Sequence, residues 1–438
     1  MIQPAFIYQL FEYLRRHSAD FPGSGLMQYI SFRSIAAAIV AIICSMLIGK
    51  HMIAYLHRKQ IGEEIRDLGL EGQFRKEGTP TMGGLIIVIS ILIPVLLFAN
   101  LSNIYIQMLI VTTIWLGALG FADDYIKTFK HNKDGLKPKY KLMGQIALGL
   151  FIALEMCFNP QARIVVTHHR TAEITEVAET GYSEVKTTEN SKEDREETIE
   201  IGTTKTTIPF VKWNEFNYRW LSPFKGKFGT WFMWFIYCLV IIFIITACSN
   251  GSNLTDGMDG LDAGVSAICG ATLGILAYLS GHTGYSQYLN IMYIPNSGEI
   301  AVFMSSMLGA LLGFLWYNSY PAQIFMGDTG SLTLGGIIGV CAVIIRKELL
   351  LPILCGIFLV ESLSVIIQRC YFKSTKKKYG TGRRYFRMAP LHHHYQRTDI
   401  PAKLKSPKNP IPEAKIVVRF WIVGLMLAVL TIVTLKIR

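Results

Sequence analysis

Residues 231–248 read WFMWFIYCLVIIFIITAC, a run without a single charged side chain. A helix needs about 20 apolar residues to cross the hydrocarbon core of a bilayer, with a range of about 17–25. The same test finds comparable segments on both sides of this run. The predicted spans are roughly residues 34–56, 82–99, 104–121, 142–158, 231–248, 261–279, 300–316, 329–345, 350–367 and 416–436. The sequence therefore predicts an all-α polytopic membrane protein with about ten transmembrane helices, folded as one domain over residues 1–438.

The composition agrees with this class. The chain is 51% hydrophobic and 17% charged, whereas a soluble globular protein carries about 25% charged residues. In a membrane protein, a net charge of +12 indicates lysines beside anionic lipid, so we expect no nucleic-acid partner. The eight cysteines show no CxxC pair or zinc spacing, and most are expected to be small buried hydrophobes. The first thirty residues lack the pattern of a cleavable signal peptide.

The charge of the loops predicts the orientation. With the N-terminus outside, the inner loops would be roughly residues 57–81, 122–141, 249–260, 317–328 and 368–415. These loops are rich in Lys and Arg. The opposite short loops carry only four basic residues, Arg15, Arg16, Arg346 and Lys347. The positive-inside rule then places all the polar motifs discussed below on the cytoplasmic face, which predicts one shared site.

One connection is much longer than the others. Residues 159–230 form an extended extracytoplasmic loop in this orientation. Its middle, residues 173–200, has almost no large apolar residues. Its flanks, at residues 163–166 and 198–210, alternate as strands do. We expect a small β-hairpin-like excursion there, and we favour a solvated loop without chemistry.

Asp123 and Asp124 directly follow the third predicted span, and Lys127 comes after them. If the helix continues, Asp123 and Lys127 share one face. Adjacent carboxylates both stay ionised only when a cation lies between them. Mg²⁺ prefers one or two carboxylates together with substrate phosphates and waters. The pair therefore indicates metal and phosphate chemistry, against the alternative of an ordinary charge cluster at a helix end.

Residues 325–331 read FMGDTGS and precede the eighth span. This run would open a helix whose unpaired N–H groups favour an anion. Thr329 and Ser331 could cap that helix, and Asp328 would then hold a metal beside a bound phosphate. A plain helix cap explains the run equally well.

Residues 250–262 place amides and carboxylates among glycines, which let the backbone approach a sugar or nucleobase closely. Asn253 and Asp256 are the expected ligand contacts, and an Asx-rich turn with structural duties is the alternative. Lys137, Lys139 and Lys141 could form an anion-binding face or simply lie near anionic lipid.

His392, His393 and His394 are consecutive. Adjacent side chains diverge, so one zinc ion rarely binds three such histidines. Hydrogen bonds to phosphate or substrate are expected instead. Residues 76–84 lack the glycine spacing of a Walker A loop, so ATP use is not indicated.

Taken in order, these motifs resemble those of the polyprenyl-phosphate N-acetylhexosamine-1-phosphate transferase superfamily. The matching stretches are residues 76–84, 123–127, 135–141, 250–260, 316–318, 325–331, 361–368 and 388–394. The uninterrupted histidine run resembles the muramoyl-pentapeptide branch, because relatives that use N-acetylglucosamine interrupt it. The resemblance covers nearly the whole chain except an insertion at about residues 159–206, where typical members have a far shorter loop.

The resemblance implies transfer of phospho-MurNAc-pentapeptide from UDP to undecaprenyl phosphate with release of UMP. It further implies Mg²⁺, a homodimer and the bacterial inner membrane. The predicted catalytic residues are Asp123, Asp124 and Asp328, with Asp328 and Asp256 as metal ligands. The predicted substrate-binding residues are Lys76, Thr81, Lys127, Lys139, Asn250, Asn253, Asp256, Asn318, Phe325, His392, His393 and His394.

A lipid phosphate with a second pKa near 6 is largely dianionic at pH 7. Direct in-line attack on the β-phosphorus is therefore favoured, with Mg²⁺ and lysines bearing the charge. Asp123 or Asp124 would orient or deprotonate the lipid phosphate, while a two-step route would make an aspartate the nucleophile. Two other functions stay open: a sister transferase for UDP-N-acetylglucosamine, and an ion-coupled transporter, which would place carboxylates nearer mid-span.

Overall fold

The computed structural model describes residues 24–58, 78–130, 132, 134–162, 164–168, 183–184, 197–201, 204–210, 215–224, 226–289 and 291–435. Helices dominate it. The first half contains η1 (Ser24–Gln28), α2 (Ile30–Arg58), α3 (Gly84–Phe98), α4 (Ile104–Phe129), α5 (Pro138–Phe158) and η3 (Pro160–Ala162). The second half contains η4 (Tyr218–Leu221), α7 (Gly226–Thr255), α8 (Leu261–Ser280), α9 (Thr283–Leu289), α10 (Gly298–Asn318), α11 (Gly327–Ile344), η5 (Glu348–Leu350), α12 (Leu351–Leu354), α13 (Gly356–Tyr379), α14 (Leu391–Gln396) and α15 (Glu413–Thr434).

The predicted spans correspond to these helices. Among the described residues, eight helices are long and apolar enough to cross a membrane, and the bent segment from η5 through α13 would make a ninth. The span predicted at residues 82–99 is α3, a shorter apolar helix of 15 residues. The span predicted at residues 350–367 is bent by 76° at a break before Gly356. The predicted fold class is confirmed, and the chain is a multi-pass membrane protein.

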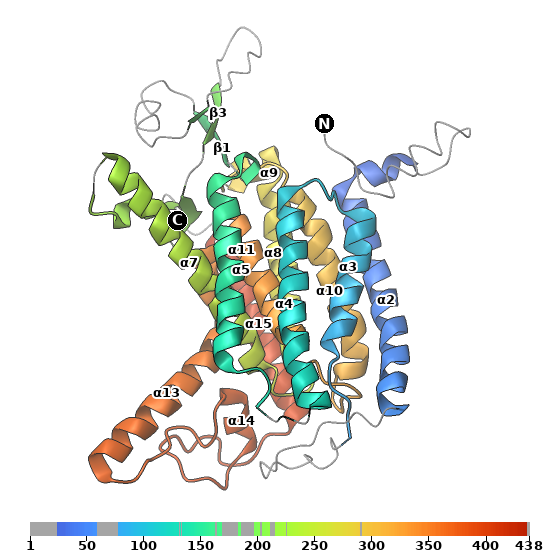
Figure 1. The fold of residues 1–438 in the computed structure, drawn as a ribbon, viewed down its shortest axis with the longest axis vertical. Helices are drawn as coiled ribbons and strands as arrows, with labels where there is room; N and C mark the ends of the chain where they lie inside the picture. The colour runs from blue at the N-terminus through green and yellow to red at the C-terminus, as the bar shows by residue number, and fades with distance from the viewer. Residues whose placement is uncertain are drawn as a thin grey trace.

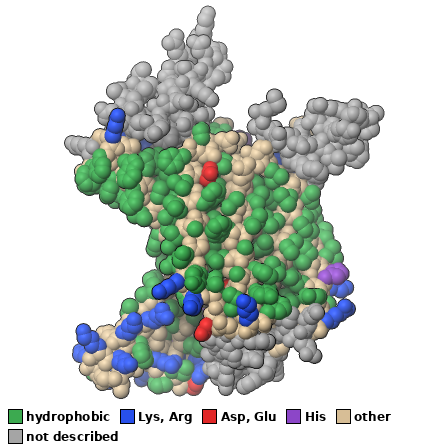
Figure 2. All heavy atoms as spheres, viewed as in Figure 1, with side chains coloured by type: hydrophobic (Ala, Val, Ile, Leu, Met, Phe, Trp, Pro, Cys, Tyr) green, Lys and Arg blue, Asp and Glu red, His purple; other side chains and the backbone are tan. Residues whose placement is uncertain are grey.

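The long helices stand side by side as a bundle, and α13 leaves its lower end as an arm beside α14 (Figure 1). Hydrophobic side chains cover the middle of the face shown, whereas Lys and Arg gather toward the lower end and along the arm (Figure 2). We call the lower end, where α4 ends and α11 begins, the aspartate end. The opposite end of the bundle is called the hairpin end.

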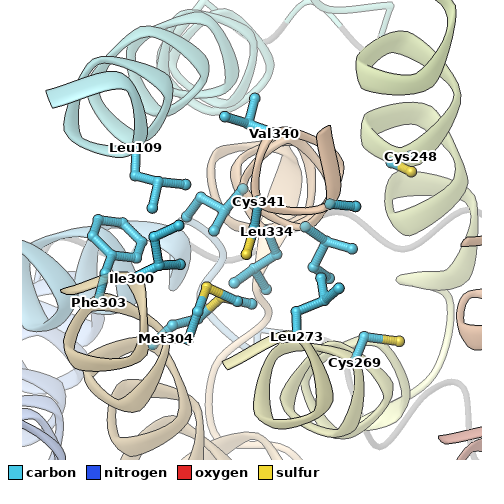
Figure 3. Close-up of a cluster of buried hydrophobic side chains, with 14 of the residues drawn as sticks. Leu109, Cys248, Cys269, Leu273, Ile300, Phe303, Met304, Leu334, Val340 and Cys341 are labelled. Carbon is cyan, nitrogen blue, oxygen red and sulfur yellow. The ribbon is translucent and has the colours of Figure 1, made fainter. Parts of the chain in front are cut away.

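Helix α11 lies at the centre of the bundle, and every residue from Thr329 to Ile344 is buried. Figure 3 shows its side chains Leu334, Val340 and Cys341 among apolar residues of the neighbouring helices. Those neighbours include Leu109 of α4, Cys248 of α7, Leu273 of α8 and Phe303 of α10. Because α11 is enclosed on all sides, its two ends are held in place by the whole bundle.

Two small antiparallel sheets lie at the hairpin end. In the first, β1 (Ile164–His168) pairs with β3 (Glu197–Ile201), and β2 (Ser183–Glu184) pairs with the other edge of β3. In the second, β4 (Lys205–Thr207) pairs with β5 (Glu215–Asn217). The predicted β excursion is confirmed. Much of the polar middle of the loop, at residues 169–182 and 185–196, lies outside the described residues.

The β4–β5 hairpin packs on the end of α11. Arg346, predicted in a short outer loop, is only 2% exposed, and its carbonyl accepts hydrogen bonds from Thr207 N at 3.0 Å and Thr206 Oγ1 at 3.1 Å. Lys347 is fully buried and its Nζ donates to Thr207 Oγ1 at 2.6 Å. This part of the long loop is therefore packed against the bundle.

Two tyrosines complete the packing around these charges. Tyr218 OH donates to Glu348 Oε1 at 3.2 Å, and Arg346 donates to Tyr237 OH while lying over the Tyr237 ring. Burial, together with the nearby Glu348 charge, raises the pKa of Tyr218 well above its ordinary value, so its hydroxyl keeps the proton that it donates. The charged groups at the hairpin end thus have partners inside the protein.

Candidate active site

Asp124 holds the start of α11. Its Oδ1 accepts a hydrogen bond from Asp328 N at 3.0 Å, and its Oδ2 accepts from Thr329 N at 2.9 Å. Thr329 Oγ1 also donates to Asp124 Oδ2, at 2.5 Å. The first N–H groups of a helix have no intrahelical partner, so this carboxylate of α4 caps α11 from a different helix. The oxygens of Asp124 are largely occupied by that role.

Asp123 faces two lysines instead. Lys127 Nζ lies 2.6 Å from Asp123 Oδ2, and Lys141 Nζ lies 2.9 Å from Asp123 Oδ1. Leu136 N also donates to Asp123 Oδ1, at 2.6 Å. Both ammonium groups reach Asp328 Oδ2 as well, Lys127 at 3.4 Å and Lys141 in direct contact. The two lysines therefore bridge Asp123 and Asp328.

This cluster can hold a metal ion. Asp123, Asp124 and Asp328 each offer one carboxylate oxygen, and these atoms lie within 4.8 Å of one another. The cluster contains three carboxylates and two ammonium groups, so its formal charge is one negative unit. Oxygen ligands of this kind suit a hard divalent cation. Asp256, the other predicted ligand, is outside this group of described carboxylates, and its role as a ligand stays a prediction.

The segment at the end of α7 joins the cluster. Asn253 Nδ2 donates to Asp328 Oδ1 and to Ser331 Oγ, both at 2.9 Å. Asn250 Nδ2 donates to Gln145 Oε1 at 2.8 Å. Asp256 follows on the same segment and is half-buried. The structure thus brings the predicted Asn253 beside the aspartates, while Asn250 ties α7 to α5.

The remaining predicted residues line the surrounding loops. Phe325 N donates to Pro80 O at 2.9 Å, which places Thr81 beside the start of α11. Asn318 is buried, with Oδ1 accepting from Gly260 N at 3.0 Å and Nδ2 donating to Ile324 O at 2.8 Å. Its amide therefore joins two loops. Lys76 lies outside the described residues.

Of the three lysines predicted to form one anion-binding face, Lys141 is the one that contacts the aspartates. Lys139 is exposed and makes no ion pair with any residue that the structure describes. Lysines two positions apart on a helix point in different directions, because neighbours on one face are three or four apart. Applied to the sequence of α5, this spacing rule could have predicted that Lys139 and Lys141 do not share one face.

The three histidines have different surroundings. His394 is buried; its Nδ1 accepts from Arg387 N at 3.1 Å and its Nε2 lies 2.7 Å from Ser406 O. Burial lowers the pKa of His394, which favours a neutral ring with Nε2 as the donor. His392 is also buried, 3.2 Å from Glu361 Oε2. Only His393 of the run is partly exposed.

Close backbone packing sets the shape of the site. A Cβ atom on Gly84 of α3 would lie 2.1 Å from Gly330 N, and one on Gly120 of α4 would lie 2.3 Å from Asp328 O. Real Cβ atoms essentially never make contacts this short. Helices α3 and α4 therefore approach α11 as closely as they do only because both positions lack a side chain.

Comparisons with known proteins now decide the family. A model described as phospho-N-acetylmuramoyl-pentapeptide-transferase signature 1 matches residues 76–88, and one for glycosyl transferase family 4 matches residues 200–346. The phospho-N-acetylmuramoyl-pentapeptide-transferases of Parabacteroides distasonis, Porphyromonas gingivalis and Flavobacterium psychrophilum are 54%, 52% and 53% identical to this chain, over 99% of it and 100% of each relative. The chain belongs to the phospho-N-acetylmuramoyl-pentapeptide-transferase family.

Membership of the phospho-N-acetylmuramoyl-pentapeptide-transferase family confirms the resemblance drawn from the motifs and makes the protein a transferase. Family membership does not favour either alternative function, the UDP-N-acetylglucosamine transferase or the ion-coupled transporter. The full-length alignments also extend the resemblance, because they run through residues 159–206.

Proposed function

We propose that this protein transfers phospho-MurNAc-pentapeptide from UDP-MurNAc-pentapeptide to undecaprenyl phosphate, giving lipid I and UMP. This reaction is the first membrane step of peptidoglycan synthesis. Family membership supports it, and the observation that carries it is the pair of lysines bridging Asp123 and Asp328. Together these groups present both signs of charge that a phosphoryl transfer between two anionic substrates requires.

The reaction exchanges one phosphorus–oxygen bond for another. An oxygen of the lipid phosphate attacks the β-phosphorus of the nucleotide sugar, and the bond from that phosphorus to the bridging oxygen breaks. UMP departs with the bridging oxygen, and the sugar phosphate stays on the lipid. Lys127 and Lys141 balance the charge on the phosphate oxygens as both anions approach. Such electrostatic stabilisation usually makes the greatest single contribution to catalysis of this kind.

The two adjacent aspartates take different parts in this proposal. Asp124 accepts three hydrogen bonds from the start of α11 and is assigned to holding Asp328 in place. Asp123 faces the ammonium groups and is assigned to orienting or deprotonating the lipid phosphate. A two-step route would use an aspartate as the nucleophile, and the position of Asp123 favours it for that role too.

Mg²⁺ is the proposed metal, held by Asp328 and, as the sequence predicts, by Asp256. When bound, the ion would supply positive charge to the diphosphate. The nucleotide and sugar would meet the loops that carry Lys76, Thr81, Asn253, Phe325 and His393. Lys127 would contact phosphate. Substrate contacts by Lys139, Asn250, Asn318, His392 and His394 stay predictions; in the structure Asn250, Asn318 and His394 bond to other protein groups and Lys139 is exposed.

The aspartate end is proposed to face the cytoplasm of a bacterium, with the protein in the inner membrane. The Lys and Arg side chains that gather at this end and on the arm support that orientation (Figure 2). A homodimer and a single domain with an outer loop at residues 159–230 are proposed from the family resemblance. Reporter fusions near Lys133, Gly257, Gly327 and Lys377 should all report the cytoplasm, and one at Glu184 the outside.

The decisive experiment measures UMP release from UDP-MurNAc-pentapeptide by the purified protein in detergent. Release should require both undecaprenyl phosphate and Mg²⁺, and lipid I should appear in equal amount. UDP-N-acetylglucosamine supplied instead should give no lipid product. Efficient transfer of N-acetylglucosamine phosphate with no turnover of the muramoyl substrate would contradict the proposal.

A further inference from the structure

A second pair of ionisable groups lies close to the proposed site. Glu361 of α13 and His392 of α14 are both fully buried, and Glu361 Oε2 lies 3.2 Å from His392 Nδ1. The same oxygen is 3.4 Å from the backbone N of His392. The carboxylate therefore holds both the ring and the backbone of the first residue of the histidine run. The proposed transfer reaction assigns Glu361 no role.

The pair leaves three polar atoms without hydrogen bonds. Glu361 Oε1 and both ring nitrogens of His392 are buried and have no hydrogen-bond partner among the described residues, although Nδ1 lies at ion-pair distance from Glu361 Oε2. Leaving such atoms unpaired inside a protein costs free energy, and native structures contain few of them. A pair that meets only the needs of folding would be expected to satisfy these atoms, so the arrangement points to a further role.

The Nε2 atom of His392 points at the substrate loop. A Cβ atom added to Gly257 would lie 2.2 Å from His392 Nε2, so the ring sits directly against the backbone of this residue. Gly257 itself is exposed and follows Asp256 in the chain. Asn253, one turn earlier near the end of α7, donates to Asp328. The ring of His392 therefore supports, from the protein side, the loop whose other side faces solvent.

We propose that Glu361 is a positioning residue for the transfer reaction. Through its contacts with Nδ1 and the backbone N of His392, it fixes the ring with Nε2 against Gly257. The ring in turn fixes the end of α7 and the turn after it, residues 253–257, relative to Asp328. Substrate binding by Asn253 and Asp256 then depends on a carboxylate that does not itself touch the substrate. This inference rests on the proposed function and adds to it a residue that acts on binding of the nucleotide substrate.

The test compares steady-state constants for Glu361→Ala, Glu361→Gln and wild type. Glu361→Ala should raise KM for UDP-MurNAc-pentapeptide about tenfold, with kcat within about threefold and KM for the lipid phosphate unchanged. Glu361→Gln keeps an acceptor for Nδ1 and should stay within about threefold of wild type in all three constants. An Ala variant with wild-type KM would overturn the proposal.

Glu299→Ala is the matched control. Glu299 is also a buried carboxylate paired with a basic side chain, Arg33, but it lies at the hairpin end. The Glu299→Ala substitution should leave KM for the nucleotide substrate unchanged, even if it lowers the unfolding temperature of the protein. An equal rise in KM in this control would show general loosening of the bundle and would contradict the assignment.

A double-mutant cycle shows whether Glu361 acts through His392. The pair Glu361→Ala with His392→Ala should raise KM no further than His392→Ala alone, because coupled residues are not additive. Additive effects would contradict the proposed link. If Glu361→Ala does not fold, Gly257→Ala provides a second test, because its Cβ atom would displace the His392 ring from the Nε2 side. This variant should show the same rise in KM for the nucleotide. A wild-type KM in Gly257→Ala would overturn the proposal. Lack of turnover by wild type would instead contradict the proposed function.

Discussion

Helix α11 carries buried charge at both ends, and the two ends differ in how that charge is treated. At the aspartate end, Asp328 and its lysine partners remain partly exposed, with Lys127 37% and Lys141 20% exposed in their side chains. At the hairpin end, Arg346 and Lys347 are 2% and 0% exposed. There the β4–β5 hairpin supplies hydroxyl and backbone partners and excludes solvent.

The difference shows that a buried charged group indicates a functional site only when part of the group remains accessible to a ligand. A charged residue inside a membrane protein is by default a candidate for function. That rule alone would rank Arg346 and Lys347 beside Asp328. The hairpin end pairs its charges with the hairpin loop and with Tyr237 of α7, whereas the aspartate end keeps a net negative formal charge that stays open to a ligand. We therefore expect substitutions at the two ends to damage different properties.

The largest effect should follow Asp328→Asn. Losing one preorganised charge at a reacting centre typically costs about 10²–10³ in rate, so UMP release should fall at least that far while the unfolding temperature in detergent changes little. Excess Mg²⁺ should not restore it. Asp134→Asn, at an exposed position on the same end, is the control. Near-normal turnover by Asp328→Asn would remove the metal assignment.

Arg346→Met should show the opposite pattern at the other end of α11. Removing one partner of a buried charged group costs about 3–5 kcal/mol, so the unfolding temperature should fall clearly. UMP release per folded molecule should stay within about twofold. The half-buried Arg219, changed to Met, serves as the control. If turnover fell while the unfolding temperature held, the two ends would be coupled and the comparison would fail.

Lys141→Met tests which lysine completes the aspartate end. Because Lys141 contacts both Asp123 and Asp328, its loss should lower kcat about tenfold, in the range of one charge-assisted contact. Lys139→Met, two residues away and exposed, should change kcat less than twofold. The reverse order would show that the predicted Lys139, and not Lys141, serves the substrate.

A smaller effect is expected from pH. The pKa of His394 is lowered by burial in the folded protein, so its unfolded form, with pKa near 6.5, takes up a proton first. The stability that it contributes is present above about pH 6.5 and is lost as the pH falls toward the folded pKa. The unfolding temperature of wild type should therefore drop more steeply from pH 7.5 to 5.5 than that of His394→Gln. Parallel slopes would contradict this.

The smallest effect should come from shortening the outer loop. Replacing residues 170–196 with a short Gly/Ser linker keeps β1, β3 and the β4–β5 hairpin. Closure entropy changes by only about 0.6 kcal/mol for each halving of a loop, so UMP release should stay within a few fold. A folded deletion variant without activity would show that this segment serves the aspartate end or a dimer contact.

The sequence predicted the spans well because length and apolarity are local properties. It did not predict the 76° bend before Gly356, which depends on how η5 and α12 pack. Nor did it predict that α13 continues to Tyr379, since the hydropathy test ends where the charged residues begin. Arg346 and Lys347 lie in a connecting loop as predicted, but their burial was not predicted, because packing by a distant hairpin leaves no mark on local composition.

At the site, the spacing of Asp123 and Lys127 predicted that they share a helix face, and the structure shows that they form an ion pair there. The separate task of Asp124 could not be predicted, because it caps a helix that begins more than 200 positions later. Glu361 could have been recognised from the sequence as a residue that needs a partner. A carboxylate inside a predicted span is costly unless it is paired, and His392 lies 31 residues away.

The contacts of Gly84 and Gly120 with the start of α11 also limit which mutations the gene can tolerate at these two codons. Any single-base change in a glycine codon that alters the product introduces either a stop or a residue with a Cβ atom. At these two codons, that atom would collide with the backbone of Gly330 or Asp328. No neighbouring codon therefore offers a tolerated replacement. We expect populations under selection for cell-wall synthesis to keep both glycines as strictly as the aspartates, although the proposed chemistry uses the aspartates alone.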